Sequence, residues 1–424
     1  MSKTINIFIP AAGFGERLRT ITFHIPKPLL PILGKPALQH VLERVLSLPV
    51  NKIGINLHHK KEAIEDWISK YFIGRGGFET CPYILFPEET ILGTGGALKN
   101  AEHFLKEGTF LVHNSDILSD IDLMGLVEHH LSSKNLVTLA VHNYPEFNNV
   151  IVDEDGFLRG VGAGLKPTLT NGRKLAFTGI AVYEPEFLQF LPDSVSSVVD
   201  AWLKAVNAGH RIGTFDVTGC YWSDIGTPDA YARALFDMLI ADGETVFVHP
   251  SVKGCKNIEM QGYVVIEEDG IFDKDVLLRN CILLPGSDVK KIALPVSPLF
   301  GGETKKVVFE NCIIGADFKI DLDRSAILGK YNEDEGQLIG AGGSDRKYYR
   351  IKRGKKTAVL MRCSSNDPDF KRQIEYTKFF LNHSVPVPEL IEIDFDEKKA
   401  VFEDAGDTSL YNWLKCPRKE MEID

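Results

Sequence analysis

The chain has 424 residues, with 58 acidic against 48 basic side chains and a formal net charge of −10. Because no basic stripe stands out, this composition argues against broad binding to nucleic acid. A hydrophobic content of 44%, with no apolar run of the roughly 18 residues that a membrane span needs, predicts a globular protein of two or three domains without a membrane partner.

The chain starts directly with a core strand and shows no signal-peptide pattern, so we expect a cytoplasmic protein. Its seven cysteines form no C-x-x-C pair. Neither a zinc site nor a disulfide framework is therefore indicated.

From residue 1 to about 240, short apolar runs alternate with helix-like segments. Apolar residues recur at i, i+3, i+4 and i+7 within 38–46 and 64–72, which predicts amphipathic helices. This alternation predicts a doubly wound α/β domain over 1–243, with a mostly parallel sheet covered on both faces. We expect strands at Ile5–Ile9, Ile53–Leu57, Tyr83–Phe86, Phe110–His113, Leu136–His142 and Phe177–Tyr183.

From about residue 245 a period of six replaces the helical period. Apolar residues stand at positions 265, 271, 277, 283 and 289, and the period resumes after an insertion at 290–306. Such a repeat favours a short left-handed parallel β-helix over 244–330. We expect this domain to provide the contact of a homo-oligomer. An irregular β-rich linker domain is the alternative.

An acidic, turn-rich stretch at 331–337 is interpreted as a linker to a third domain, 331–424. There a strand, glycine turn and strand are followed by a further strand, a helix at Phe370–Leu381 and two apolar runs. This order predicts a small α+β domain.

The strand at Ile5–Ile9 leads into a glycine-rich turn, Ala11 to Gly15. Glycines without a Cβ let backbone N–H groups approach a polyphosphate, and the start of a helix adds partial positive charge. Arg17 and Lys27 add full charges. The turn lacks the third glycine of a dinucleotide fingerprint and the G-K-[ST] of a Walker loop. An ordinary turn between a strand and a helix is the remaining alternative.

The segment 10–31 resembles the signature of sugar-1-phosphate nucleotidyltransferases, A-G-x-G-x-R-L followed by P-K-P-L-x-P. The resemblance implies Mg²⁺-dependent transfer from a nucleoside triphosphate to a sugar 1-phosphate, which gives a nucleotide sugar and pyrophosphate. It implies catalytic roles for Arg17 and Lys27, and nucleotide binding by Ala11, Ala12, Gly13 and Gly15.

Two aspartates stand where such an enzyme needs metal ligands. Asp116 ends the apolar run FLVHNSD, and Asp224 lies in YWSDIGT. Either alone reads as a turn or helix-cap residue. Both match the metal-binding aspartates of the family, and Mg²⁺ needs few carboxylates besides phosphate oxygens and water.

The stretch 87–101 resembles the base-recognition loop of the family. This implies that backbone groups at Gly95 and Gly96 read the base while Glu88 flanks it. Thr178 and Gly179 match the strand that lines the sugar pocket, and Lys166 lies in the triplet Leu-Lys-Pro where many hexose members have Glu-Lys-Pro.

The missing glutamate weakens a glucose 1-phosphate assignment. Details of the loop and strands resemble N-acetylmuramate 1-phosphate uridylyltransferases most. We therefore expect UTP with an N-acetylmuramate or N-acetylhexosamine 1-phosphate, in cell-wall sugar metabolism.

Residues 338–414 resemble the N-terminal lobe of aminoglycoside-phosphotransferase-like sugar kinases. Kinase chemistry also needs a catalytic aspartate, usually in H-G-D, and this sequence has none. The Asp394–Asp396 triplet reads as a hairpin turn, so we expect a truncated lobe without kinase activity. The alternative functions are a non-catalytic nucleotide-sugar-binding subunit and one half of a bifunctional kinase and nucleotidyltransferase.

Overall fold

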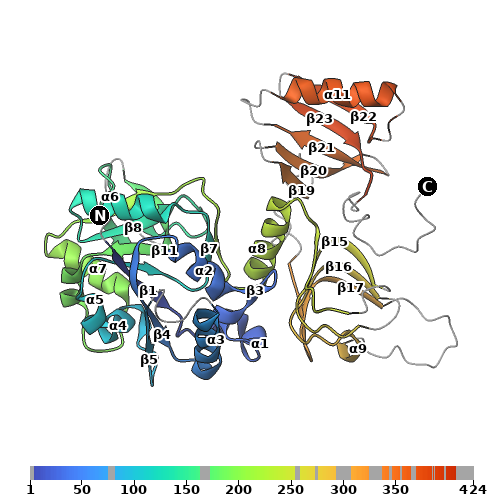
Figure 1. Cartoon of the computed structure of the whole chain (residues 1–424). Helices are drawn as coiled ribbons and strands as arrows, with labels where there is room; N and C mark the ends of the chain where they lie inside the picture. Colours follow the sequence, from blue (N-terminus) through green and yellow to red (C-terminus); the bar gives the residue numbers. More distant parts are fainter. Residues whose placement is uncertain are drawn as a thin grey trace. The chain divides into compact units, whose positions relative to one another are not determined.

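The computed structural model describes residues 4–74, 82–162, 172–253, 258–272, 276–292, 307–323, 337–342, 346–353, 356–363, 369–383, 385, 387–395 and 398–406. The chain divides into two compact units, Met1–Gly226 and Thr227–Asp424 (Figure 1). Within the described residues, no helix is long and apolar enough to cross a membrane.

A nine-stranded sheet forms the centre of the first unit. Four strands at one end are parallel, in the order β5–β4–β1–β6. Next to β6 lies β11, followed by β8 and β12. Strand β9 of the β9–β10 hairpin also pairs with β11. The bounds are β1 Ile5–Pro10, β4 Val50–Leu57, β5 Tyr83–Pro87, β6 Phe110–His113, β8 Val137–His142, β9 Val150–Val152, β10 Leu158–Val161, β11 Arg173–Tyr183 and β12 Ile212–Asp216.

The expectation of a mostly parallel sheet needs correction at β11, which runs antiparallel to both β6 and β8. A parallel partner for β8 requires a crossover connection, usually a helix. Between β8 and β11 the described chain forms only the hairpin of β9 and β10. The sheet is therefore mixed.

The two faces of this sheet bury separate apolar clusters. Because successive side chains of a strand point to opposite faces, Ile5, Ile7 and Ile9 of β1 join one cluster and Phe8 joins the other. Helices α2 (Ala37–Val45), α3 (Lys61–Ile73) and α6 (Leu123–Ser133) contribute to the first, and α4 (Gly93–Asn100), α5 (Glu102–Leu105) and α7 (Val198–Asn207) to the second. The expected α/β core with helices on both faces is confirmed.

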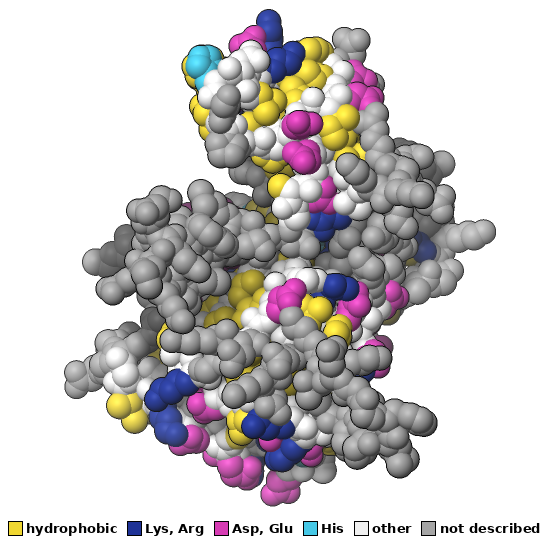
Figure 2. Space-filling view, turned by 90° about the vertical axis from the view of Figure 1, so that its right-hand side faces the viewer, with side chains coloured by type: hydrophobic (Ala, Val, Ile, Leu, Met, Phe, Trp, Pro, Cys, Tyr) yellow, Lys and Arg dark blue, Asp and Glu magenta, His cyan; other side chains and the backbone are white. Residues whose placement is uncertain are grey.

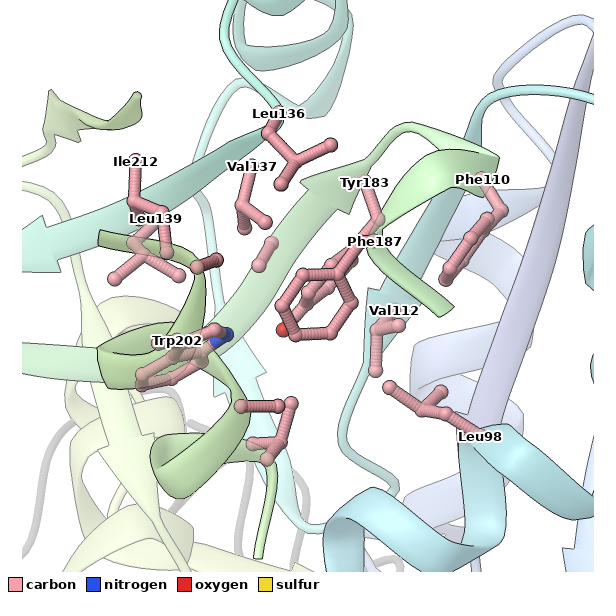
Figure 3. Close-up of a cluster of buried hydrophobic side chains, with 14 of the residues drawn as sticks. Leu98, Phe110, Val112, Leu136, Val137, Leu139, Tyr183, Phe187, Trp202 and Ile212 are labelled. Carbon is pink, nitrogen blue, oxygen red and sulfur yellow. The ribbon is translucent and has the colours of Figure 1, made fainter. Parts of the chain in front are cut away.

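Aromatic side chains pack among aliphatic ones in the second cluster (Figure 3). The rings of Phe110 and Tyr183 stack with their centroids 5.3 Å apart, and Phe187 packs against Tyr183 at 5.0 Å. Each large aromatic side chain removes about 150–250 Å² from water. This packing ties β6 to β11.

The remaining elements of the first unit are short. They are η1 (Glu16–Leu18), α1 (Arg19–Thr22), η2 (Lys27–Leu29), β2 (Pro31–Ile32), β3 (Lys35–Pro36), β7 (Ile117–Ser119), η4 (Pro185–Phe190) and β13 (Trp222–Asp224). Strands β7 and β13 pair antiparallel.

The second unit begins with α8 (Pro228–Ala241) and a five-stranded sheet. Its first four strands are parallel, and the fifth is antiparallel. Val246 pairs with Val264, and Ile258 with Val276, so these partners lie 18 residues apart along the chain. Three hexads of the sequence period give this offset, while a left-handed β-helix stays a prediction. Between β16 and β17, where the insertion at 290–306 intervenes, Val276 pairs with Val307. The strands are β14 Val246–Val248, β15 Ile258–Ile266, β16 Val276–Leu283, β17 Val307–Ile314 and β18 Lys319–Asp321, with α9 at Val289–Ile292.

Stacked left-handed residues turn the strands of this sheet at one corner. Gly262, Asn280 and Asn311 have φ values of 64°, 51° and 49°. Asn280 Nδ2 donates to Asn311 Oδ1 at 3.0 Å, and Tyr263 N donates to Asn280 Oδ1 at 3.1 Å. Asparagine tolerates this backbone region better than most residues and caps the turn with its side chain.

A separate antiparallel sheet follows, in the order β19–β20–β21–β23–β22. Helix α11 lies between β21 and β22 in the chain and contributes Phe370 and Ile374 to the core of this part. Apolar side chains also lie at its surface (Figure 2). Asp394 pairs with Lys399 across the β22–β23 connection, as a hairpin requires, whereas Asp396 lies outside the described residues. The bounds are β19 Gln337–Gly342, β20 Arg346–Arg353, β21 Lys356–Arg362, α11 Phe370–Asn382, β22 Leu390–Asp394 and β23 Lys399–Glu403.

Candidate active site

A cavity of about 410 Å³ lies in the first unit, where β1, β4 and β6 end. The carboxyl edge of parallel strands is the usual ligand site of an open α/β sheet. A second hollow, of about 530 Å³, lies between α11 and β22, but its lining is largely apolar and exposed. The candidate catalytic, nucleotide-binding and metal-binding residues that line the first cavity are Ala11, Ala12, Gly13, Gly15, Arg17, Lys27, Glu88 and Asp116.

The glycine-rich turn between β1 and η1 forms one wall of the cavity. Gly15 has left-handed backbone angles, φ 63° and ψ 42°, and its carbonyl accepts from Leu18 N at 2.9 Å. A Cβ on Gly15 would lie 2.8 Å from Thr22 Cγ2. At Gly13, in contrast, a Cβ would meet no described protein atom within 4 Å. The fold itself therefore requires glycine at position 15, whereas position 13 faces open space.

Four charged residues meet beside this turn. Lys27 Nζ forms an ion pair with Asp116 and lies 3.8 Å from Asp224 Oδ1. Arg17 Nη2 lies 3.5 Å from Asp224 Oδ2. The structure thus brings together the four residues that the sequence singled out for catalysis and metal binding.

Strand pairing holds the two aspartates side by side. Asp116 lies between β6 and β7, and Asp224 ends β13, where it pairs with Ile117 of β7. Ile225 N also donates to Asp116 O at 3.1 Å. Gly226 follows, and a Cβ there would lie 2.4 Å from Arg17 Nη2. A glycine at this position leaves room for the guanidinium beside the carboxylate.

Burial, followed by the charge of Asp116, raises the pKa of Asp224, while Lys27 and Arg17 act in the opposite direction. Asp224 Oδ1 is buried and has no hydrogen-bond partner among the described residues. A buried carboxylate oxygen without a donor, next to a second carboxylate, is suited to a cation.

The donor set fits magnesium better than a metal held by protein ligands alone. Within the described parts of the chain, no group of three or more His, Cys, Asp or Glu side chains could hold a metal ion. Mg²⁺ commonly takes one or two carboxylates and completes its shell with water and substrate phosphates. The Asp116 and Asp224 pair meets that requirement.

The loop expected to read the base is tied to a second segment of the protein by two of its amides. The amides of Gly95 and Gly96 both donate to Ser196 O, at 2.8 and 3.4 Å. A Cβ on Gly95 would lie 2.7 Å from Ser196 Oγ. The protein itself therefore uses these two amides, and base reading by other backbone groups around Gly95 and Gly96 stays a prediction. Gly93, Thr94 and Ala97 of α4 line the cavity instead.

The residues expected at the sugar lie behind the cavity wall. Thr178 is fully buried, and its hydroxyl donates to Ala140 O at 2.8 Å. Trp222 Nε1 donates to Thr178 O at 2.8 Å, and Asn114 N donates to Gly179 O at 3.0 Å. Neither residue is among the described cavity-lining residues, and Lys166 lies outside the described part of the chain. Their contact with a sugar stays a prediction.

Sequence reasoning missed several cavity residues, among them Asn56, Thr94, Asn114 and Ser115. Asn56 carried a signal, because it is a polar residue in the otherwise apolar segment Ile53–Leu57 and is 3% exposed. A buried amide is almost always hydrogen-bonded. Its partners come from separate segments, which the sequence alone does not identify.

Comparison with known proteins places this architecture in a family. Residues 7–239 match the family described as Nucleotidyl transferase. The chain is 27% identical over 319 residues to a mannose-1-phosphate guanyltransferase of Hypocrea jecorina, covering 69% of this chain and 85% of that protein. It is 28% identical over 362 residues to a UTP–glucose-1-phosphate uridylyltransferase of Synechocystis, covering 75% and 91%.

A third relative is the bifunctional protein GlmU of Methanococcus vannielii, 32% identical over 275 residues, covering 61% of this chain and 60% of that protein. The family match spans more than half of the chain and includes the glycine-rich turn and both aspartates. The chain therefore belongs to the nucleotidyl transferase family and is an enzyme of the pyrophosphorylase type.

Proposed function

We propose that this enzyme transfers a nucleoside monophosphate from a nucleoside triphosphate to a sugar 1-phosphate, giving a nucleotide sugar and pyrophosphate with Mg²⁺ as cofactor. The observation that carries the proposal is the meeting of Arg17, Lys27, Asp116 and Asp224 beside the glycine-rich turn. The sugar-1-phosphate activities named for the relatives support the same reaction.

The chemistry requires positioning and charge neutralisation. An oxygen of the sugar phosphate attacks the α-phosphorus of the triphosphate, the bond from that phosphorus to the bridging oxygen breaks, and pyrophosphate leaves. A phosphate monoester is largely a dianion at neutral pH, so no protein group has to remove a proton. Catalysis then rests on in-line approach and on cations that offset the developing charge.

Each residue of the cluster has a role in this scheme. The Ala12–Gly15 part of the turn holds the phosphates with its amides, and Arg17 neutralises charge at the cavity mouth. Lys27, 12% exposed, supplies a cation close to the reacting phosphates. Asp116 and Asp224 would hold the divalent cation, which when bound would neutralise the phosphate oxygens.

We propose UTP as the nucleotide and an N-acetylmuramate or N-acetylhexosamine 1-phosphate as the acceptor, from the resemblance of the 87–101 loop and the absence of a glutamate before Lys166. GTP is the second candidate, because several relatives are guanylyltransferases. We further propose three domains, 1–243, 244–330 as a left-handed β-helix that mediates homo-oligomerisation, and 331–424 as a kinase-like lobe.

A pyrophosphate-release screen tests the proposal. UTP, GTP, dTTP, CTP and ATP are each combined with a panel of sugar 1-phosphates, with the Asp224→Asn variant as control. Release that requires both substrates and a divalent cation supports the reaction. Nucleotide-sugar binding without turnover of any pair would favour the non-catalytic alternative, and a best pair other than UTP with an N-acetylated sugar would overturn only the substrate assignment.

A further inference from the structure

Two buried polar side chains connect two segments that line the cavity. Asn56 Oδ1 accepts from Ala11 N at 2.7 Å, and Asn56 Nδ2 donates to Glu88 Oε1 at 2.8 Å. Glu88 Oε2 accepts from Leu92 N at 3.0 Å. Ala11 begins the glycine-rich turn, whereas Leu92 immediately precedes α4. The chain of three hydrogen bonds therefore runs from the phosphate side to the α4 side of the cavity.

The sheet places these two residues next to each other. Pro10 of β1 pairs with Asn56 of β4, and Leu57 of β4 pairs with Pro87 of β5. Glu88 N donates to Leu57 O at 2.8 Å. Asn56 and Glu88 are 3% and 5% exposed, and both line the cavity. Because both side chains are buried, the loss of any one of these three hydrogen bonds is costly.

The direction of each hydrogen bond is fixed. Ala11 N–H and Leu92 N–H can only donate, and an ionised Glu88 can only accept. Asn56 must therefore present its oxygen to Ala11 and its amide nitrogen to Glu88. Both Glu88 oxygens are engaged within the protein, so its carboxylate supports the loop.

We infer that Asn56 and Glu88 are positioning residues that set the spacing between the phosphate-binding turn and the α4 wall, and so determine affinity for the nucleoside triphosphate. The inference rests on the proposed function, because it assigns this cavity to that nucleotide. Ala11 lies on one side of the bridge, and Gly93 and Thr94 line the cavity on the other. A nucleotide that contacts both sides is held well only when their spacing is correct.

Single substitutions disrupt this series of hydrogen bonds in a predictable way. Asn56→Asp places two carboxylates against each other where an amide met a carboxylate. Glu88→Gln leaves an N–H facing another N–H, whichever way the two amides are turned. Combining the two changes repairs the chain, because the new carboxylate at position 56 accepts from Ala11 N and from the new amide at position 88. The oxygen of that amide accepts from Leu92 N. The double variant also keeps the net charge of the wild type.

Calorimetric titration with UTP and with GTP, in the absence of sugar phosphate, measures the effect without turnover. We expect each single variant to bind the preferred nucleotide about 10- to 100-fold more weakly, the range set by one unsatisfied buried group. The Asn56→Asp/Glu88→Gln variant should bind within about threefold of the wild type. In the coupled assay the single variants should raise the KM for the triphosphate more than the KM for the sugar phosphate.

Ile55→Val is the matched control for stability. Ile55 precedes Asn56 on β4 and is fully buried in the apolar cluster, so its truncation lowers the melting temperature without touching the bridge. It should bind nucleotide as the wild type does. Single variants that melt earlier but bind normally would overturn the inference, as would a folded double variant that does not recover binding.

The double variant keeps the test valid if a single variant does not fold. A failure of the proposed function looks different: the wild type would bind a triphosphate but release no pyrophosphate with any sugar phosphate. The binding comparison among the variants would still decide the role of the bridge.

Discussion

The Gly13→Ala substitution tests whether glycine at position 13 is required by the ligand or by the fold. The new methyl group would meet no described protein atom within 4 Å, and the φ of Gly13 is not positive. At such a position, replacing glycine restricts the unfolded chain and stabilises by about 0.4–1 kcal/mol. The melting temperature of Gly13→Ala should therefore equal that of the wild type or exceed it by roughly 1–4 °C.

The same methyl group points into space that a polyphosphate would occupy, because Gly13 lines the cavity. Displacing the phosphates from one backbone amide loses a hydrogen bond to a charged group, worth about 1.5–3 kcal/mol. Affinity for the nucleoside triphosphate should fall about 10- to 150-fold.

Gly95→Ala is the matched control with the opposite expectation. Its Cβ would lie 2.7 Å from Ser196 Oγ and 3.0 Å from the backbone carbon of Ser197. Overpacking of this kind costs about 1–3 kcal/mol, which lowers the melting temperature by roughly 2–12 °C in a domain of this size. Weaker nucleotide binding should accompany that loss only to the extent that α4 moves.

Thermal unfolding followed by circular dichroism, together with calorimetric titration of UTP and GTP, measures both quantities on the same samples. The expected pattern is normal melting with weak binding for Gly13→Ala. If Gly13→Ala instead melts early and binds nucleotide like the wild type, the glycine serves the fold and the phosphate assignment of the turn fails.

Three further outcomes are expected. Asp116→Asn and Asp224→Asn should each lower kcat at least about a hundredfold at saturating Mg²⁺, because each removes a charged ligand; near-normal turnover in either would remove that residue from the site. Burial and Asp116 raise the pKa of Asp224, so Mn²⁺ affinity should be lost, as pH falls, at a pH above about 4, where an ordinary aspartate titrates. Lys27→Met removes a cation that lowers this pKa and should shift the loss of Mn²⁺ affinity to higher pH. An unchanged midpoint of Mn²⁺ affinity against pH would contradict the electrostatic coupling. Deleting 331–424 should leave nucleotidyl transfer almost unchanged, and the intact chain should phosphorylate no free sugar; ATP-dependent sugar phosphorylation that Asp394→Ala abolishes would overturn the hairpin interpretation.

The sequence by itself determined the α/β class, and it singled out, through its motifs, four charged residues that the structure brings together. A strand followed by Ala11–Gly15, with Arg17 and Lys27 close behind, is a local pattern whose geometry follows from a few adjacent residues. The helical period likewise identified the buried face of α2, because amphipathic spacing needs no knowledge of the partner surface.

Only the tertiary structure decided the direction of β11, the hydrogen bonds made by the amides of Gly95 and Gly96, and the bridge through Asn56 and Glu88. The hydrogen bonds depend on partners that lie far away in the chain: Ser196 for the two glycines, and Ala11 and Glu88 for Asn56. A buried polar group must find a hydrogen-bond partner. The sequence shows which polar groups are in apolar segments and need a hydrogen-bond partner. Only the tertiary packing decides which distant atom is that partner.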